Sequence, residues 1–187
     1  MKRKLLLSLL LTVSAHAASP EPVTIFGLPL GGKLKSMPKQ CPTSVISDDR
    51  STLLCWLEKP FFYKPTGSLS GGINVPNRHM LPKWAAFALV DAQISKNGEL
   101  EELDVRSLSS GWEIARSIEA RFGTPTVSRL DARRPSAEWS RPEIAIRLLC
   151  DGTEYCYVKF WSAAAKAAYD QEMDERRNQE AKRSVSP

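Results

Sequence analysis

Four cysteines are the residues with the clearest chemical potential in this chain. Cys150 and Cys156 enclose the segment Asp-Gly-Thr-Glu-Tyr, and Cys41 and Cys55 lie 14 positions apart. Zinc sites commonly use closely paired cysteines or histidines, such as Cys-x-x-Cys, and this chain has no such pair. We therefore expect structural disulfides, no redox pair, no metal and no cofactor. Four cysteines allow three connectivities, of which we favour Cys41–Cys55 with Cys150–Cys156.

Signals for nucleophilic catalysis are incomplete. His79 is the only histidine apart from His16. The Gly-x-Ser-x-Gly elbow needs serine at its centre, but "GSLSG" carries Leu69 there. "SMPK" matches Ser-x-x-Lys, yet Pro38 disrupts the helix that this motif requires.

Paired carboxylates give no better catalytic signal. Asp48-Asp49 and Glu101-Glu102 are adjacent in sequence, so the two members of each pair point in different directions. Working glycosidase pairs instead converge across a cleft. We expect no enzymatic activity. The alternative is a small periplasmic cell-wall hydrolase that uses His79 or a carboxylate pair formed by the fold.

An aromatic cluster is the strongest candidate for binding. Phe61, Phe62 and Tyr63 stand between Pro60 and Pro65. They begin a segment, residues 59–84, that is rich in proline and glycine, and long irregular segments in compact domains are commonly functional. We predict an exposed aromatic binding loop here, because aromatic residues dominate interface anchors. The competing interpretation packs these rings against the core.

The N-terminus reads as a secretory signal peptide. Three basic residues at 2–4 precede the apolar stretch Leu5 to Val13, and Ala15 and Ala17 supply the small residues at the cleavage site. The apolar stretch is about half of the roughly 20 residues that a membrane span needs. We expect a signal peptide at 1–17 and a periplasmic or secreted protein without a stable membrane anchor.

Removal of that signal peptide changes the charge. The formal net charge of +5 includes the three basic residues at 2–4, and without them 23 basic residues face 21 acidic ones, a net charge of +2. The remaining basic residues are interspersed with acidic ones, so we expect no nucleic-acid partner. The expected partner is another envelope protein or a cell-wall component.

Two hairpins should form the framework. The dipeptide Asn97-Gly98 favours a tight turn, and this turn pairs Ile94 with Glu101, Ala92 with Leu103 and Val90 with Val105. A second hairpin centred on Thr153 pairs Cys150 with Cys156, Leu148 with Val158 and Ile146 with Phe160. In both hairpins the alternating apolar residues then share one face, so pattern and turn agree on the register.

Helical patterns follow each hairpin. Ser110 and Glu113 form a capping box, and Gly123 with Pro125 ends an amphipathic helix over about 111–122. The C-terminal segment 163–187 is rich in strong helix formers, with Ser162 as its N-cap. The predicted fold is α+β. It has an antiparallel sheet of two hairpins covered by the 111–122 helix, stabilised by disulfides and followed by a C-terminal helix.

The predicted organisation has four parts. These are the signal peptide at 1–17, a disulfide-linked segment with a long loop at 18–84, an α+β core at 85–162, and a charged helix and tail at 163–187.

Two motifs support a resemblance to exported bacterial proteins. The opening "FGLPLGGKLKSMPKQCP" and the helix end "EARFGTPT" resemble a group of uncharacterised exported small α+β proteins. The helix end is also similar to envelope modules of the SmpA/OmlA and beta-lactamase-inhibitor-protein type. This resemblance implies a non-enzymatic binder, an inhibitor or envelope accessory factor. The chain lacks the lipoprotein cysteine of SmpA/OmlA. A third hypothesis is assembly through the C-terminal helix.

Overall fold

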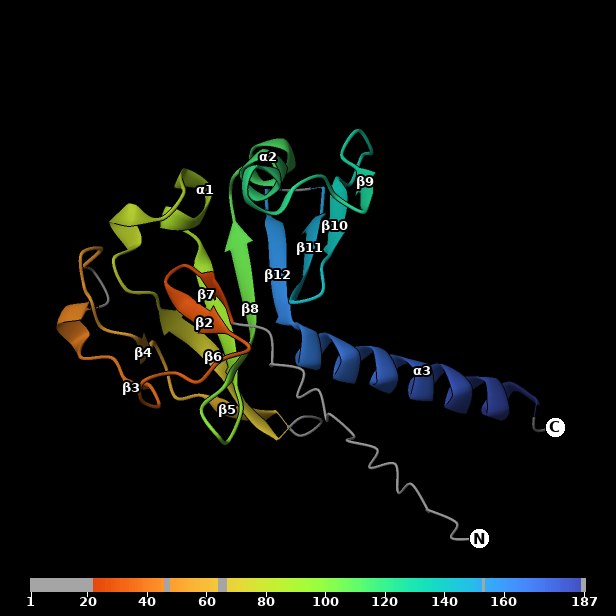
Figure 1. The fold of residues 1–187 in the computed structure, drawn as a ribbon, viewed down its shortest axis with the longest axis horizontal. Helices are drawn as coiled ribbons and strands as arrows, with labels where there is room; N and C mark the ends of the chain where they lie inside the picture. Colours follow the sequence, from red (N-terminus) through yellow and green to blue (C-terminus); the bar gives the residue numbers. More distant parts are fainter. Residues whose placement is uncertain (1–21, 46–47, 64–66, 153, 186–187) are drawn as a thin grey trace, which may run out of the picture.

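The two predicted hairpins lie side by side at the centre of one large sheet (Figure 1). The structure is a computed structural model, and it describes residues 22–45, 48–63, 67–152 and 154–185. β7 (Leu89–Ile94) pairs with β8 (Leu100–Ser107), and β11 (Ile144–Cys150) pairs with β12 (Cys156–Ser162). An antiparallel β8–β12 pairing joins the two hairpins. The predicted signal peptide at 1–17 lies outside the described residues.

The sheet extends beyond this centre on both sides. Its order is β3-β4-β6-β7-β8-β12-β11-β10-β9, and β5 pairs with β6. The remaining strands are β1 (Val23–Ile25), β2 (Leu28–Leu30), β3 (Lys39–Gln40), β4 (Cys55–Trp56), β5 (Phe61–Tyr63), β6 (Ser68–Asn74), β9 (Val127–Arg129) and β10 (Ser136–Ser140). The helices are η1 (Thr43–Val45), η2 (Arg78–Met80), α1 (Lys83–Ala86), α2 (Gly111–Phe122) and α3 (Ala163–Val185).

The α+β class is confirmed, but the predicted sheet was too small and too regular. The sheet is mixed, because β3 pairs in parallel with β4 and β2 meets β8 in parallel at Leu30 and Leu100. The segment 59–84, predicted as an irregular loop, contains β5, β6, η2 and α1. Strand β6 carries Ser-Gly-Gly, residues with low strand propensity, and its pairing with β4, β5 and β7 overrides that propensity.

The hairpin registers are largely confirmed. In β11–β12 all three predicted pairs form, and in β7–β8 the pairs Val90–Val105 and Ala92–Leu103 form. Ile94 pairs with Leu100 rather than Glu101, because an irregularity next to Gln93 leaves Glu101 as a bulged residue. The Ser68 hydroxyl donates to the Glu101 carboxylate at 2.5 Å.

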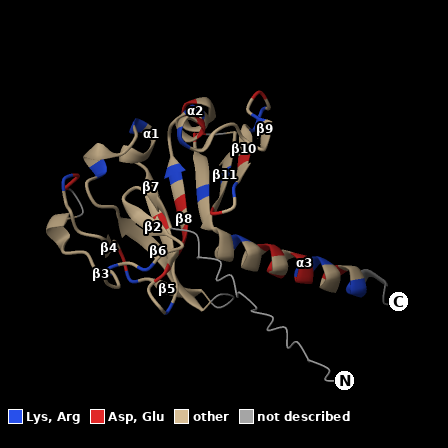
Figure 2. Cartoon of the chain, in the orientation of Figure 1, with Lys and Arg blue, Asp and Glu red and all other residues tan. Residues whose placement is uncertain are grey.

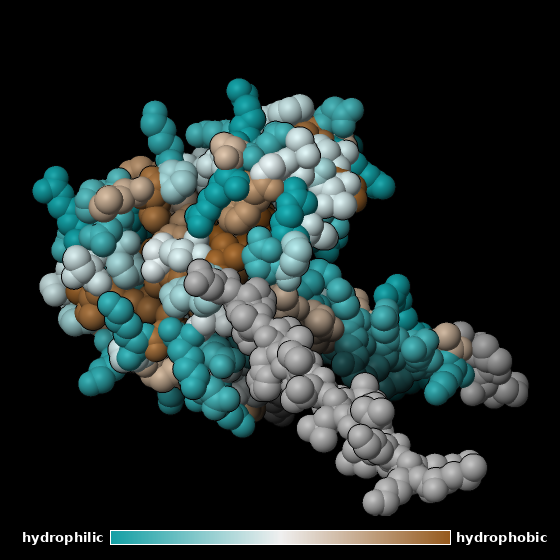
Figure 3. Space-filling model, in the orientation of Figure 1, coloured by the Kyte–Doolittle hydropathy of each residue, from teal (hydrophilic) through white to brown (hydrophobic). Residues whose placement is uncertain are grey.

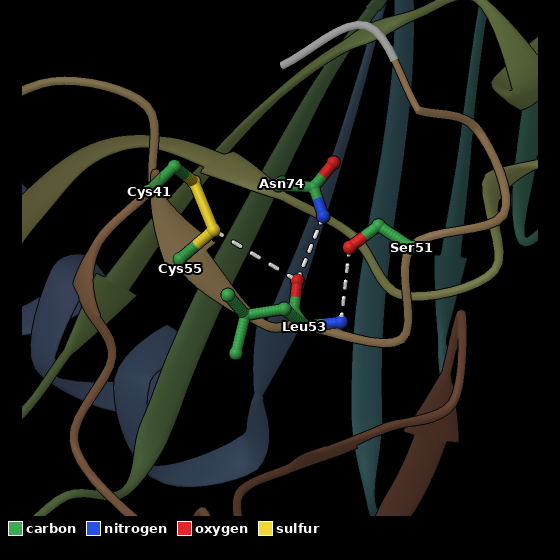
Figure 4. The surroundings of a disulfide bond; sticks show 5 residues. All are labelled: Cys41, Ser51, Leu53, Cys55 and Asn74. Carbon is green, nitrogen blue, oxygen red and sulfur yellow. Dashed lines mark hydrogen bonds between the residues drawn. A yellow bond between two sulfur atoms is a disulfide. The ribbon is translucent and has the colours of Figure 1, made fainter. Parts of the chain in front are cut away.

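Both favoured disulfides are present. Cys150 and Cys156 lie directly opposite each other at the mouth of the β11–β12 hairpin. The Cys41–Cys55 bond ties the chain just after β3 to β4 (Figure 4). Beside it, the Asn74 side-chain amide donates to the Leu53 carbonyl at 2.7 Å, so this disulfide also adjoins the end of β6.

The predicted helix over 111–122 covers one end of the sheet, with Ile114, Ala115 and Ile118 buried. The Ser110 hydroxyl accepts from the Glu113 N–H at 3.3 Å, which confirms the N-cap. Gly123 ends the helix with φ +75° and ψ −172°, a conformation that is accessible to glycine but differs from the left-handed helical one of the common glycine cap.

Replacing Gly111 with alanine should destabilise the protein by about 1–3 kcal/mol. A Cβ at this position would lie 2.9 Å from the Cys150 Sγ and 3.1 Å from the Pro135 Cβ. Alanine is the better helix former, but the disulfide and the proline ring leave no room for it. Urea unfolding measures the effect, with Arg116→Ala on the exposed side of the same helix as control. An increase in stability would show that this contact relaxes freely.

Helix α3 projects away from the sheet (Figures 1 and 2). The Ser162 hydroxyl accepts from the Ala165 N–H at 3.2 Å, as predicted for an N-cap. Near its start, the Tyr169 ring lies 5.8 Å from that of Trp161. Further along, ion pairs between residues of the same helix, such as Glu172–Arg176 and Asp174–Arg177, stabilise α3. No described helix is long and apolar enough to cross a membrane.

Candidate functional site

The predicted aromatic cluster is exposed, but it lies on a strand rather than in a loop. Phe61 and Phe62 in β5 are 60% and 52% exposed, and Tyr63 is half-buried. Large apolar side chains on a short strand at a sheet edge form a surface suited to contact with another molecule. We call β5, with its side chains Phe61, Phe62 and Tyr63, the aromatic edge. It lies at the end of the sheet opposite α2 (Figure 1).

The aromatic edge also offers unpaired backbone. Within the described residues, β5 pairs only with β6, through Phe61–Ser70, Phe62–Leu69 and Tyr63–Ser68. The Tyr63 carbonyl accepts from the Gly67 N–H at 2.9 Å, so it faces β6. Backbone groups alternate in direction along an antiparallel strand. The N–H and C=O of Phe62 therefore point away from β6.

Two lysines stand beside the aromatic edge. The Lys96 ammonium lies 5.3 Å from the Phe62 ring centroid, a cation–π distance. Exposed Lys59 directly precedes Pro60 at the start of the strand. Lys59 and Lys96 therefore place positive charge beside the exposed phenylalanines, with exposed Glu58 next to Lys59 and the Glu101 carboxylate bound to Ser68 opposite Tyr63.

Of the residues considered for catalysis, His79 and Asp49 lie close together, but through the Asp49 backbone carbonyl and not through its carboxylate. His79 lies in η2, exposed, with its Nδ1 3.2 Å from the backbone carbonyl of Asp49. Ser36 and Lys39 of the Ser-x-x-Lys match lie in a bend and in β3 rather than on a helix. Among the residues that the structure describes, no three His, Cys, Asp or Glu side chains gather as metal ligands would.

On the central strands, the face opposite the buried apolar residues carries charged residues. The Lys159 ammonium bridges Glu102 at 2.9 Å and Asp104 at 3.2 Å. Burial alone would lower the pKa of Lys159, but these two carboxylates raise it overall. Burial and the Asp104 charge raise the pKa of Asp91, which stands directly opposite Asp104. Burial also raises the pKa of Glu101, against the effect of its Ser68 hydrogen bond.

Replacing Asp91 with asparagine should stabilise the protein by a few tenths of a kcal/mol at pH 7, because it removes a like-charge cross-strand pair. The raised pKa means that the folded state holds the proton more tightly than the unfolded state. The ionised Asp91 carboxylate therefore destabilises the folded state at pH values above its folded-state pKa. That penalty disappears as pH falls below the ordinary aspartate value. Unfolding of both forms from pH 3 to 8 tests this, and a gain that persists at pH 3 would contradict it.

The structure also has a concavity that the sequence analysis did not predict. It has a volume of about 390 Å³ and lies between the β1–β2 turn, the η2–α1 segment, α2 and β12. Buried Ile25, Trp84, Ile118 and Phe160 form its floor, and Arg121 stands among its lining residues. These residues are scattered from 24 to 160. The sequence singled out the opening motif, the segment 59–84 and the helix over 111–122 separately, and it gave no sign that these segments meet at one pocket.

Comparisons with known proteins identify no relative. No protein-family model matches the chain, and no significant match is found among curated proteins or solved structures. The resemblance to exported α+β proteins and to SmpA/OmlA modules therefore stays a prediction.

Proposed function

We propose that this is a non-enzymatic binding protein of the cell envelope, periplasmic or secreted, that acts as an inhibitor or accessory factor for another envelope protein. The observation that carries this proposal is the aromatic edge. It combines two exposed phenylalanines with a strand whose outer backbone groups are unpaired within the described residues.

The proposed mode of binding is addition of an extended segment of the partner to β5. In this mode main-chain hydrogen bonds supply affinity and alternate side chains supply specificity. Phe61 and Phe62 project to opposite faces of the strand, so the partner can contact one ring from each side. Lys59 and Lys96 favour a segment that carries acidic as well as apolar residues.

Site-specific photocrosslinking in the periplasm tests this proposal. A benzoylphenylalanine at position 61 or 62 should crosslink to one partner, and the same group at exposed Trp112 on α2 serves as the matched control. Phe61→Ser with Phe62→Ser should weaken binding of the identified partner by about thirtyfold or more, since buried aromatic anchors dominate interfaces. The melting temperature should stay nearly unchanged, because both rings are exposed.

A pair of substitutions separates backbone from side-chain binding. Phe62→Val and Phe62→Pro both remove the ring, but only proline also removes the outward N–H, a position where a sheet edge tolerates it. Strand addition predicts that the proline form binds more weakly than the valine form. Equal crosslinking from position 112 would overturn the proposal. A large fall in melting temperature in the serine double variant would instead make the aromatic cluster structural.

A further inference from the structure

The concavity beside α2 has the dimensions of a ligand site. Its volume of about 390 Å³ falls within the roughly 300–1,000 Å³ typical of small-molecule pockets. Apolar residues gather between α2 and the β1–β2 hairpin in the middle of the face shown in Figure 3. Met80, 74% exposed, stands among the lining residues as a flexible apolar side chain. The lining takes no residue from β5, so this site is separate from the aromatic edge.

The wall of this pocket is held in an unusual backbone conformation. Phe26 has φ +53° and Asn77 has φ +54°, and both line the pocket. A left-handed conformation is costly for phenylalanine. Phe26 keeps it while its ring lies 5.8 Å from that of Trp84 and 6.0 Å from that of Phe160. Phe26 and Gly27 form the two-residue loop between β1 and β2, and positive φ at both positions is what a tight hairpin turn of this kind requires. The turn therefore holds the Phe26 ring in the pocket wall.

Two polar side chains of the pocket, Arg121 and Ser117, offer hydrogen-bond donors. Arg121 is the one ionisable side chain among the described lining residues. It donates to the Thr24 carbonyl, which fixes it beside β1, and a guanidinium has further donors to offer. The Ser117 hydroxyl accepts from the Trp84 indole N–H at 3.0 Å, which leaves its own hydrogen to donate.

We infer that the pocket binds a small amphipathic carboxylate. The apolar body lies between Phe26, Trp84 and Ile118, and the carboxylate accepts from Arg121 at the rim. A cationic head group has no counter-charge in this lining, and an uncharged one leaves the guanidinium without its strongest type of acceptor.

Titration with decanoate tests the site, using the Trp84 indole N–H resonance as the local probe. The chain has five tryptophans, and Trp84 is the one that lines this pocket. Decanoate should shift the Trp84 resonance, assigned with Trp84→Phe, at concentrations below about 1 mM. Decanol and decyltrimethylammonium serve as neutral and cationic ligands with the same chain.

Arg121→Gln should weaken decanoate binding by about tenfold to a hundredfold, the loss expected for a charge-assisted hydrogen bond. It should leave decanol binding unchanged. Arg116→Gln, exposed on the same helix and outside the lining, should change neither.

Three results would overturn the inference. They are the absence of decanoate binding below 1 mM, a shift confined to another indole, and equal binding of decanoate and decyltrimethylammonium to both Arg121 forms. Because Arg121 is exposed, Arg121→Gln leaves the core intact, and its unfolding curve verifies this.

Discussion

Reduction of both disulfides should lower the free energy of unfolding by about 5 kcal/mol. The Cys41–Cys55 bond spans 14 positions and the Cys150–Cys156 bond spans six. By the loop-entropy relation, loops of these sizes are worth about 3 and about 2 kcal/mol. Domains are stable by only about 5–15 kcal/mol, so the reduced chain should approach the unfolding threshold. Urea unfolding with and without a phosphine reductant measures the difference.

Paired substitutions assign the loss to each bond. Cys41→Ala with Cys55→Ala should cost more than Cys150→Ala with Cys156→Ala, because the first pair closes the longer loop. Strands β11 and β12 remain paired along their length without the second bond. A reduced protein as stable as the oxidised one would mean that neither bond constrains the unfolded chain, and would remove one argument for an oxidising compartment.

The central hairpins were predictable because two independent signals agreed. Alternation of apolar residues fixed the faces of β7 and β8, and Asn97-Gly98 placed the chain reversal correctly. The turn itself differs from the prediction, because it spans Ser95 to Gly98 and only Gly98 of the pair has a positive φ. The same agreement placed Cys150 opposite Cys156. The prediction failed at Ile94, because a bulge leaves no trace in a period-two pattern.

The outer strands were not predictable from local pattern. Strand β6 has Gly71 and Gly72 at its centre, and glycine has low strand propensity. Strand β10 follows a Pro-containing connection and carries the buried residue Trp139. Both strands are stabilised by pairing with strands that are distant in the sequence, and local sequence patterns do not reveal such pairing.

The candidate sites show the same division. The cluster Phe61-Phe62-Tyr63 was visible as a run of aromatics, but its exposure depends on which strand lies beside it. Among the described residues it pairs on one edge only, with β6. The pocket beside α2 combines residues that are far apart in the chain, so no motif with a fixed spacing predicts it. The sequence therefore indicated the aromatic edge, whose residues are adjacent in the chain, but not the pocket, whose residues are brought together by the fold.

Replacing Trp139 with alanine should destabilise the protein by about 3–5 kcal/mol, the range for removing a large aromatic from a core. Trp139 is 1% exposed, and its indole N–H donates to the Gly123 carbonyl at 2.9 Å. The substitution therefore opens a cavity and also leaves the carbonyl at the end of α2 without its donor. Calorimetry or urea unfolding measures the loss.

Two further variants divide that loss into its parts. Trp112→Ala removes the same side chain from a position that is 51% exposed on α2, so it should change stability by about 0.5 kcal/mol or less. Trp139→Phe keeps most of the ring and removes the hydrogen bond to Gly123, so its cost should lie between the two alanine variants. Equal costs at positions 112 and 139 would contradict the burial of Trp139. A phenylalanine form as stable as the original would show that packing alone, and not the hydrogen bond, joins β10 to the end of α2.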